Sequence, residues 1–254
     1  MDLKKRYKVI EIPVNEGTVD ATAKTICKLT EDITGKYVCI ANVHMLVTAR
    51  SDIQLFNILK NADIVTSDGM PLVWALKKQG CQNAERVAGP DLTLKLCILA
   101  SEMDLPVYFF GGTEKSVKAL MKCLPQKFPK LKIAGIESPP MLPSKPDIVD
   151  SVVNRIEASG AKIVFVGLGC PKQEFWMAEY SKHLPATLIG VGAAFDFLAG
   201  TTKRAPLWMQ KNGLEWFFRL LSEPRRLWKR YLITNSLFIY YLLQESIYQK
   251  IKKK

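Results

Sequence analysis

The chain alternates short β-favouring runs with longer segments of helical periodicity, and this alternation restricts its possible folds more than any other feature. The predicted strands are residues 36–42, 62–68, 106–112, 131–138, 161–169 and 186–192. Most of these runs are continuously apolar, as in strands buried on both faces of a parallel sheet. The alternation therefore predicts an α/β fold with a doubly wound, mostly parallel, Rossmann-like sheet.

Helical patterns separate the predicted strands. The clearest cover residues 53–62, 71–80, 91–103 and 113–124. Gly80 is placed to end one helix, and Thr113 is placed to cap another. The proline-rich segment 138–147 is predicted to be a surface loop. After Gly200 the strand signal ends, which predicts a body of residues 1–200 and a helical appendage of residues 201–254.

The predicted appendage combines positive charge with aromatic side chains, two properties that usually occur apart. It holds twelve Lys/Arg against three acids, and so carries nine of the twelve excess positive charges of the chain. Three of the five tryptophans also lie in it, namely Trp208, Trp216 and Trp228. A basic segment of this kind indicates a polyanionic partner: nucleic acid, anionic lipid or a phosphate-rich ligand.

No run in the sequence predicts a membrane-spanning helix. The most apolar stretch, residues 231–243, covers about thirteen residues, whereas a spanning helix needs roughly twenty. The N-terminus is basic but lacks the apolar run of a signal peptide. Six scattered cysteines without a CxxC pair, and only two histidines, argue against structural zinc and favour a reducing compartment. We therefore expect a cytoplasmic protein that lies on a membrane without crossing it.

Ligands of open α/β sheets bind at the carboxyl ends of the strands, so the residues that follow the predicted strands are the candidate site residues. They are Asn42, His44, Thr66, Ser67, Asp68, Gly69, Gly111, Gly112, Thr113, Gly167, Gly169, Pro171, Lys172, Gln173, Glu174, Gly190, Gly192 and Asp196. Glycine turns offer backbone N–H groups to phosphates, and the lysine, amides and carboxylates add polar contacts around the same crevice. The set fits a nucleotide-type ligand.

Structural interpretations compete with the functional ones at several of these positions. Asp68 is equally expected as a turn residue, and Lys172 as a solvated residue at a helix start. A packing or capping role for His44, and a capping or hydrogen-bonding role for Asp196, are favoured over catalysis. The stretch VGLGCPKQE lacks the third glycine of a dinucleotide fingerprint, and no P-loop motif occurs. No DxD sequence offers an obvious carboxylate pair for a nucleotide-bound metal ion.

Six motifs occur in a characteristic order between about residues 42 and 231. They are TSDGMPLVW, ERVAGPDL, FFGG, GLGCPKQE, GVGAAFDFLAG and RAPLWMQKNGLEWFFRLLSEPRRLWKRY. In these motifs the chain resembles the WecG/TagA/CpsF glycosyltransferases, family twenty-six of that enzyme class. The resemblance implies an inverting transferase that moves an N-acetylmannosamine-type or related sugar from a UDP donor. The implied acceptor is undecaprenyl-diphosphate-linked N-acetylglucosamine, in bacterial cell-surface polysaccharide synthesis.

The resemblance also implies roles for individual residues. Asp68, in the DGM sequence, matches the catalytic base proposed for the family, and Gln173, in PKQE, matches an active-site glutamine. Arginines of the appendage are implicated as well. We expect Arg204, Arg219 and Arg226 to bind the diphosphate of the donor, because the planar guanidinium group matches two diphosphate oxygens at once.

One position departs from the family pattern. Many members carry Thr two residues before the first-strand Asn, where this chain has Ile40, so the polar contact of that Thr cannot be made here. Because arginines can neutralise the leaving diphosphate, no metal ion or other cofactor is expected. The expected partners are the donor, the lipid-linked acceptor and the anionic inner face of the bacterial cell membrane, with no nucleic acid. The family tends to self-associate through the body, and the sequence leaves open whether this chain forms a homo-oligomer.

Two other classes of function remain open on the sequence. A basic nucleic-acid-binding protein would explain the appendage but not the series of glycine turns, and it predicts a steeply salt-dependent affinity. A Rossmann oxidoreductase that binds a nucleotide cofactor would explain the sheet but not the appendage.

Overall fold

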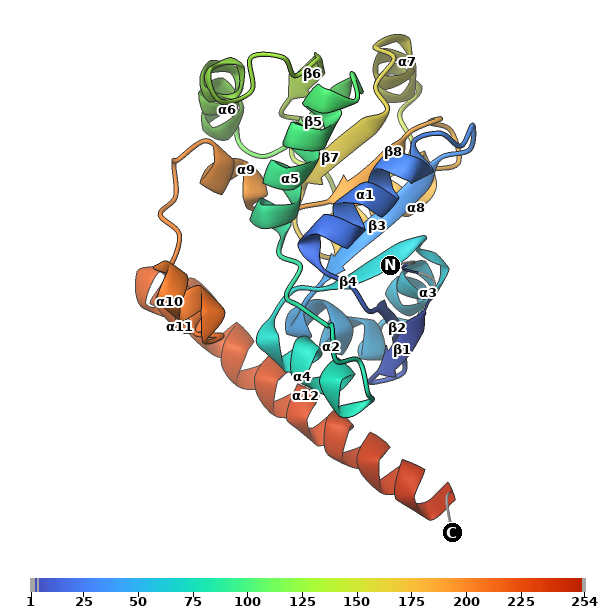
Figure 1. Cartoon of the computed structure of the whole chain (residues 1–254), viewed down its shortest axis with the longest axis vertical. Coiled ribbons are helices and arrows are strands. Elements are labelled where there is room, and N and C mark those ends of the chain that lie inside the picture. Colours follow the sequence, from blue (N-terminus) through green and yellow to red (C-terminus); the bar gives the residue numbers. More distant parts are fainter. Residues whose placement is uncertain (1–2, 4, 253–254) are drawn as a thin grey trace.

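The computed structural model describes residue 3 and residues 5–252, and it contains one six-stranded sheet (Figure 1). Its strands are β3 (Lys36–Ala41), β4 (Ile64–Ser67), β5 (Val107–Gly111), β6 (Ile133–Glu137), β7 (Ile163–Gly167) and β8 (Thr187–Gly190). They lie in the order β4-β3-β8-β7-β5-β6, and every neighbouring pair is parallel. All six predicted strands are present, and the doubly wound α/β fold is confirmed.

The chain winds outward in both directions from the middle of this sheet. It passes from β3 to β4 on one side and from β5 to β6 on the other, and β7 and β8 then fill the centre. Because all strands are parallel, their carboxyl ends meet at one edge, and the change of winding direction lies next to β3 and β8. Ligand sites of such sheets lie at this switch point.

Helices cover both faces of the sheet, and each face has its own apolar core. One core joins the sheet to α1 (Val19–Leu29), α5 (Gly89–Glu102), α6 (Glu114–Lys127) and α9 (Ala194–Leu198). The other joins it to α2 (Val43–Ser51), α3 (Ile53–Asn61), α7 (Asp150–Ala158) and α8 (Lys172–Tyr180). The four clearest predicted helices correspond to α3, α4 (Met70–Lys78), α5 and α6, and Thr113 caps α6 as expected. The segment 138–147 holds no regular helix or strand.

An N-terminal hairpin was not predicted from the sequence. Strands β1 (Arg6–Val9) and β2 (Ile12–Asn15) pair through a two-residue turn in which Ile10 and Glu11 have φ of +45° and +71°. Such a turn normally uses Asn or Gly, so this dipeptide gives no turn signal. The Oδ1 atom of Asn15 accepts a hydrogen bond from Val65 N at 2.8 Å, which fixes the hairpin beside β4.

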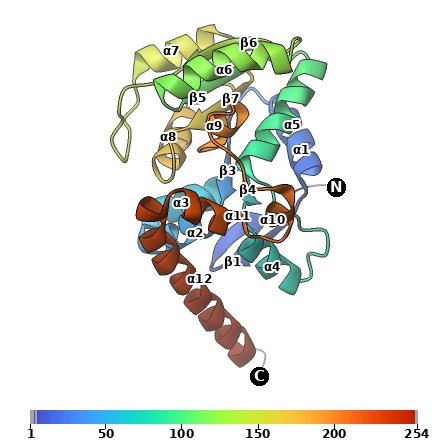
Figure 2. The same cartoon turned by 90° about the vertical axis from the view of Figure 1, so that its left-hand side faces the viewer.

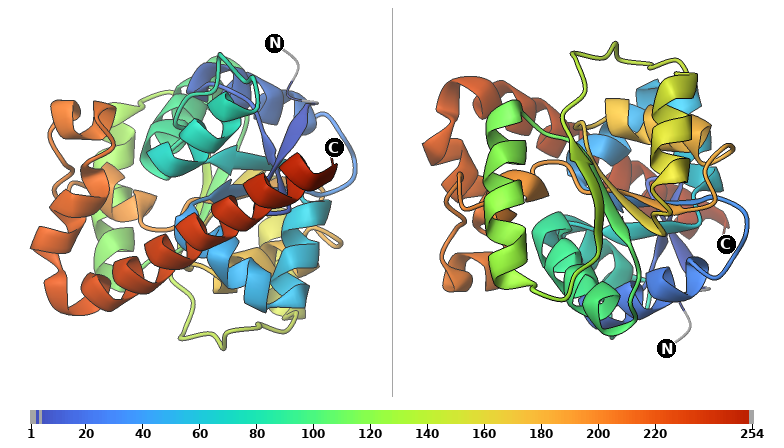
Figure 3. Two further views of the ribbon diagram at one scale, coloured as in Figure 1. Left: turned by 90° about the horizontal axis from the view of Figure 1, so that it is seen from below. Right: turned by 90° about the horizontal axis from the view of Figure 1, so that it is seen from above.

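The last fifth of the chain forms three helices, α10 (Leu207–Lys211), α11 (Glu215–Ser222) and α12 (Pro224–Lys252). Pro224 begins α12, as expected for a residue without an N–H. From the side, the C-terminal part of α12 extends past the body (Figure 2). Viewed from below, α12 crosses the molecule diagonally (Figure 3). It packs on α2 and buries Leu227, Thr234 and Phe238. Within the described part of the chain, no helix is long and apolar enough to cross a membrane.

Candidate active site

Two adjoining cavities are lined by residues at the carboxyl ends of β3, β4 and β8 and by residues of α11 and α12. The smaller, of about 160 Å³, contains Gly69 and is called the Asp68 cavity below. The larger, of about 650 Å³, contains the turns at Gly169 and Gly192 and is called the glycine cavity. The residues that line both are Asn42, Asp68, Arg219, Arg230 and Tyr231. These five residues therefore mark where the two cavities meet.

Strand β4 places Asp68 at this junction. The Asp68 N–H donates to the Ala41 carbonyl at the end of β3, at 2.7 Å. Gly69 follows with φ of +125°, a conformation open mainly to glycine, and leads directly into α4. Burial raises the pKa of the Asp68 carboxyl, while the charges of Arg86 and Arg219 act in the opposite direction. A carboxylate whose pKa is raised is a better proton acceptor.

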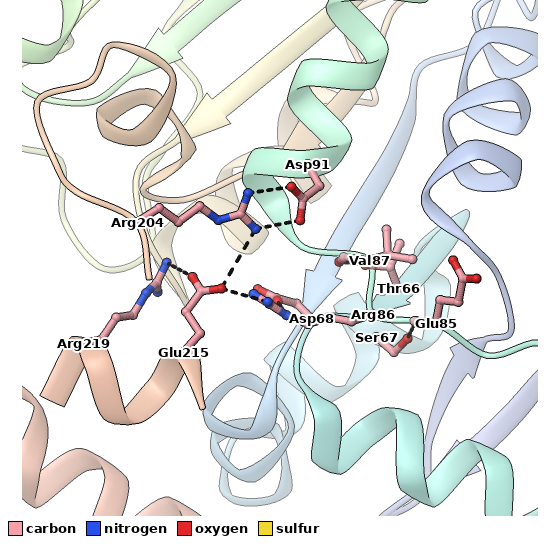
Figure 4. A network of polar contacts seen from close by, with 10 residues as sticks. All are labelled: Thr66, Ser67, Asp68, Glu85, Arg86, Val87, Asp91, Arg204, Glu215 and Arg219. Carbon is pink, nitrogen blue, oxygen red and sulfur yellow. Dashed lines mark hydrogen bonds and ion pairs between the residues drawn. The ribbon is translucent and has the colours of Figure 1, made fainter. Parts of the chain in front are cut away.

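Arg86 connects Asp68 to the C-terminal helices (Figure 4). Its Nε lies 3.2 Å from Asp68 Oδ1, and its Nη1 lies 2.8 Å from Glu215 Oε2. Glu215 is the first residue of α11 and its side chain is only 8% exposed. It also faces Arg219 Nη2 at 3.4 Å and Arg204 Nη2 at 3.9 Å. One acid from α11 is thus surrounded by three arginines, which ties this helix to the body.

The arginines around Glu215 differ in how fully they are paired. Arg204 forms a bidentate pair with Asp91, with N–O distances of 2.5 and 2.6 Å, which holds the loop before α10 against α5. Neither oxygen of Glu215 accepts a well-aligned hydrogen bond, so its contacts with arginine are mainly between charges. Among the described residues, the buried Nε of Arg230 has no hydrogen-bond partner. The protein therefore leaves the guanidinium of Arg230 incompletely hydrogen-bonded.

Arg219 of α11 and Arg226 of α12 line the glycine cavity. Arg219 stacks over the ring of Phe197, with its Cζ 5.0 Å from the ring centroid. Arg226 is largely exposed and pairs with Glu223 at 2.6 Å. An exposed pair of this kind contributes little to stability, so a diphosphate can displace it at small cost.

Gln173 shapes the floor of the glycine cavity. Its Oε1 accepts hydrogen bonds from Gly169 N at 3.2 Å and Gly192 N at 3.1 Å, and so links the turns after β7 and β8. Its Nε2 donates to Glu174 Oε1 at 2.8 Å. Glu174 is fully buried, and burial raises its pKa to about 7. The predicted active-site glutamine is therefore at the cavity, with Glu174 behind it.

His44 lies in the wall of the Asp68 cavity. Burial, with a smaller effect from the charge of Arg230, lowers its pKa to about 4. The imidazole is consequently neutral at neutral pH and adds no positive charge beside Asp68. At the start of the same helix, the Asn42 side chain caps α2 by accepting from Met45 N at 3.1 Å. Ile40, where many family members have Thr, gives the glycine cavity an apolar contact.

Ten of the predicted site residues do not line either cavity. These are Thr66, Ser67, Gly111, Gly112, Thr113, Gly167, Pro171, Lys172, Glu174 and Arg204. A Cβ at Gly111 would lie 2.7 Å from the backbone of Gly167, so close approach of β5 and β7 explains Gly111. A Cβ at Gly112 or Gly167 would instead meet the ring of Phe195. Lys172 Nζ instead donates to the carbonyl of Leu142 in the proline-rich loop. Asp196 accepts from Ser116, in agreement with its expected hydrogen-bonding role.

Sequence reasoning left out three residues that the structure places in the site: Arg86, Glu215 and Arg230. Arg86 lies in the ERVAGPDL motif, which had no role attached. Glu215 is one of only three acids among the twelve Lys/Arg residues of the appendage, and this rarity was the one signal in the sequence that could have identified it. Within the described residues, no three His, Cys, Asp or Glu side chains are grouped as a set of metal ligands.

Residues 7–252 match the glycosyl transferase WecG/TagA/CpsF family. The chain belongs to this family. A curated relative from Bacillus spizizenii is 32% identical over 199 residues, which cover 78% of this chain and 75% of the relative. That relative is named N-acetylglucosaminyldiphosphoundecaprenol N-acetyl-beta-D-mannosaminyltransferase. The WecG/TagA/CpsF match includes the Asp68 and glycine cavities and all of α12, so this chain is a glycosyltransferase whose C-terminal helices belong to the family pattern.

Proposed function

We propose that this glycosyltransferase moves an N-acetylmannosamine-type sugar from a UDP donor to undecaprenyl-diphosphate-linked N-acetylglucosamine. The observation that carries the proposal is the Asp68 carboxylate at the junction of two cavities that are large enough, together, for a donor and an acceptor. The name of the Bacillus relative supports the class of sugar and acceptor.

In the proposed reaction, the acceptor sugar occupies the Asp68 cavity and the UDP-sugar the glycine cavity. Asp68 accepts the proton of the acceptor hydroxyl as its oxygen attacks the anomeric carbon. The bond between that carbon and the UDP oxygen breaks, UDP leaves with the electron pair, and the configuration inverts. A positioned general base contributes typically ~10²–10⁴ in rate.

The departing UDP gains negative charge, and arginines are proposed to neutralise it. Arg219, Arg226 and Arg230 line the glycine cavity from α11 and α12. Arg230 Nε is buried without a hydrogen-bond partner among the described residues, so the protein does not fully satisfy this guanidinium. Guanidinium groups bind diphosphates through charge-assisted, often bidentate hydrogen bonds. The helices that carry these groups are then part of the catalytic site rather than a separate tail.

We also propose that helices α10 to α12 rest on the anionic inner face of the cell membrane. Large apolar side chains are exposed along them: Leu207, Trp208, Trp216, Phe217, Leu221, Trp228, Leu232, Ile233, Leu237, Ile239, Tyr240, Leu243 and Ile247. Arg225 and Lys229 lie exposed among these side chains. Mixed aromatic and basic surfaces of this kind are typical of interfacial helices. Each basic residue near an anionic surface contributes roughly 1 kcal/mol.

A direct assay tests the function. The protein is incubated with candidate UDP-sugars and a lipid-diphosphate-N-acetylglucosamine acceptor, and the lipid product is analysed by mass spectrometry. We expect the acceptor to gain one N-acetylhexosamine with UDP-N-acetylmannosamine. Transfer of a different sugar would replace N-acetylmannosamine in the proposal by that sugar. The absence of transfer from every UDP-sugar would overturn the proposal.

A further inference from the structure

An apolar groove runs between α4 and α12, away from the glycine turns. Its volume is about 460 Å³, and it is called the α4–α12 groove below. Trp74 and Ala75 of α4 form one wall, and Phe238, Ile239 and Leu242 of α12 form the other. Trp74 is 57% exposed and Ile239 59% exposed, so large apolar surface faces an open channel. Unfilled apolar surface of this kind marks a binding site more often than chance exposure.

This groove is continuous with the Asp68 cavity. Val43, Pro71, Trp216 and Asn235 line both. The charged residues of the groove lining, Lys78 and Glu245, belong to α4 and α12. Along α12 the groove extends from Asn235 to Ser246, which corresponds to roughly 16 Å of helix.

The chemistry at the two ends limits what can fill the groove. Arg219 and Arg230 line the Asp68 cavity at one end. The far end is lined by Lys78, Gln79, Glu245 and Ser246, and the exposed side chains of Leu243 and Ile247 follow next to them on α12. A ligand that fits must place an anionic head among the arginines and a long apolar chain along the helix. A polyprenyl diphosphate has this sequence of groups, because the diphosphate joins the sugar directly to the chain.

We propose that the α4–α12 groove binds the first isoprene units of the lipid acceptor and directs the chain from the Asp68 cavity to the membrane. The inference rests on the proposed function, because it takes the acceptor to be lipid-linked. It assigns Trp74, on the body, and Ile239, on α12, as walls of one lipid channel. The position of α12 against α4 then governs both catalysis and the choice of acceptor chain.

The test compares two acceptors that share the diphosphate-N-acetylglucosamine head. One carries a polyprenyl chain in detergent micelles, and the other carries a short alkyl chain and dissolves in water. The probe variants are Ile239→Asn and Trp74→Ala, one on each wall of the groove. The matched control is Leu243→Asn, since Leu243 lies on the same helix, is also 59% exposed and does not line the groove.

We expect each probe variant to lower kcat/KM for the polyprenyl acceptor roughly tenfold relative to the short-chain acceptor, through loss of apolar contact. Leu243→Asn is expected to leave this ratio at the wild-type value. Turnover of the short-chain acceptor by every variant shows that each is folded and that the glycosyltransferase function holds.

Several results would overturn the groove assignment while leaving the function intact. One is an unchanged ratio in both probe variants, and another is an equal fall of the ratio in Leu243→Asn. A third is a dimer in the wild type that Ile239→Asn abolishes, which would give the groove to a second copy of the chain. Failure of the wild type with both acceptors would instead count against the proposed function.

Discussion

The Glu215 carboxylate provides a sharp test of how the C-terminal helices are joined to the body. We consider Glu215→Gln, which keeps the size of the side chain and removes its charge. The mutation deprives Arg86, Arg204 and Arg219 of an acid that lies 2.8, 3.9 and 3.4 Å from them. Breaking a buried ion pair typically costs ~3–5 kcal/mol.

Remaining partners reduce this cost in the present case. Arg86 retains Asp68 and Arg204 retains its bidentate pair with Asp91. We therefore expect a loss of about 1–3 kcal/mol, the range for leaving a buried polar group without its partner. For a protein of this size the corresponding fall in Tm is about 2–12 °C. The control is Glu179→Gln, because Glu179 forms an exposed pair with Lys182 and should contribute little.

The same variant has a second, independent readout in the pH dependence of turnover. The charge of Glu215 raises the pKa of Asp68, so its removal lowers that pKa. The acid limb of kcat/KM should then move to lower pH, because Asp68 stays ionised further into the acid range. Calorimetry and a pH–rate profile measure the two effects. A Tm equal to that of Glu179→Gln, with an unmoved acid limb, would refute the network as described.

Three further predictions concern the same region. Arg86→Gln removes a charge that holds the pKa of Asp68 down, so the acid limb of kcat/KM should move to higher pH; an unmoved or lowered limb would contradict this. Activity should survive excess EDTA because arginines can neutralise the diphosphate, and rescue of a chelated enzyme by Mg²⁺ or Mn²⁺ would contradict it. Truncation before Ser222 should leave a folded body, since both sheet cores lie almost entirely outside α12. The truncated protein should neither sediment with anionic liposomes nor transfer sugar, and retention of both properties would refute the roles of α12.

The sheet was predictable from the sequence because its strands are buried on both faces. Continuous apolar runs such as β5 and β7 leave few other structures to consider. The β1–β2 hairpin was not predictable, because Ile10 and Glu11 adopt left-handed conformations without the usual turn residues. Helix α2 was also not among the predicted helices. It is packed between the sheet core and α12, so its sequence lacks the continuous polar face that reveals a helical period.

The fold class alone predicted the site only where its residues follow strands, whereas Arg219 and Arg226 were expected from the family resemblance. Asp68, Gly69, Gly169 and Gln173 meet because parallel strands end at one edge, and this follows from the fold class. Glu215 reaches Arg86 through long-range packing, and periodicity within a helix contains no information on such a contact. Gly111 is a case in which the sequence predicted a binding role that the structure does not support. It matched a phosphate-binding turn, but it allows the close approach of β5 to β7.

Turnover of Asp68→Asn tests the central claim most directly. The measurement is single-turnover transfer to the lipid acceptor, with UDP-sugar affinity determined separately on the same protein. The account predicts unchanged donor binding and a rate at least about a hundredfold below wild type, because the acceptor hydroxyl loses its proton acceptor. A rate near that of the wild type would show that Asp68 is not the base and that the junction of the two cavities is not where the proton is taken.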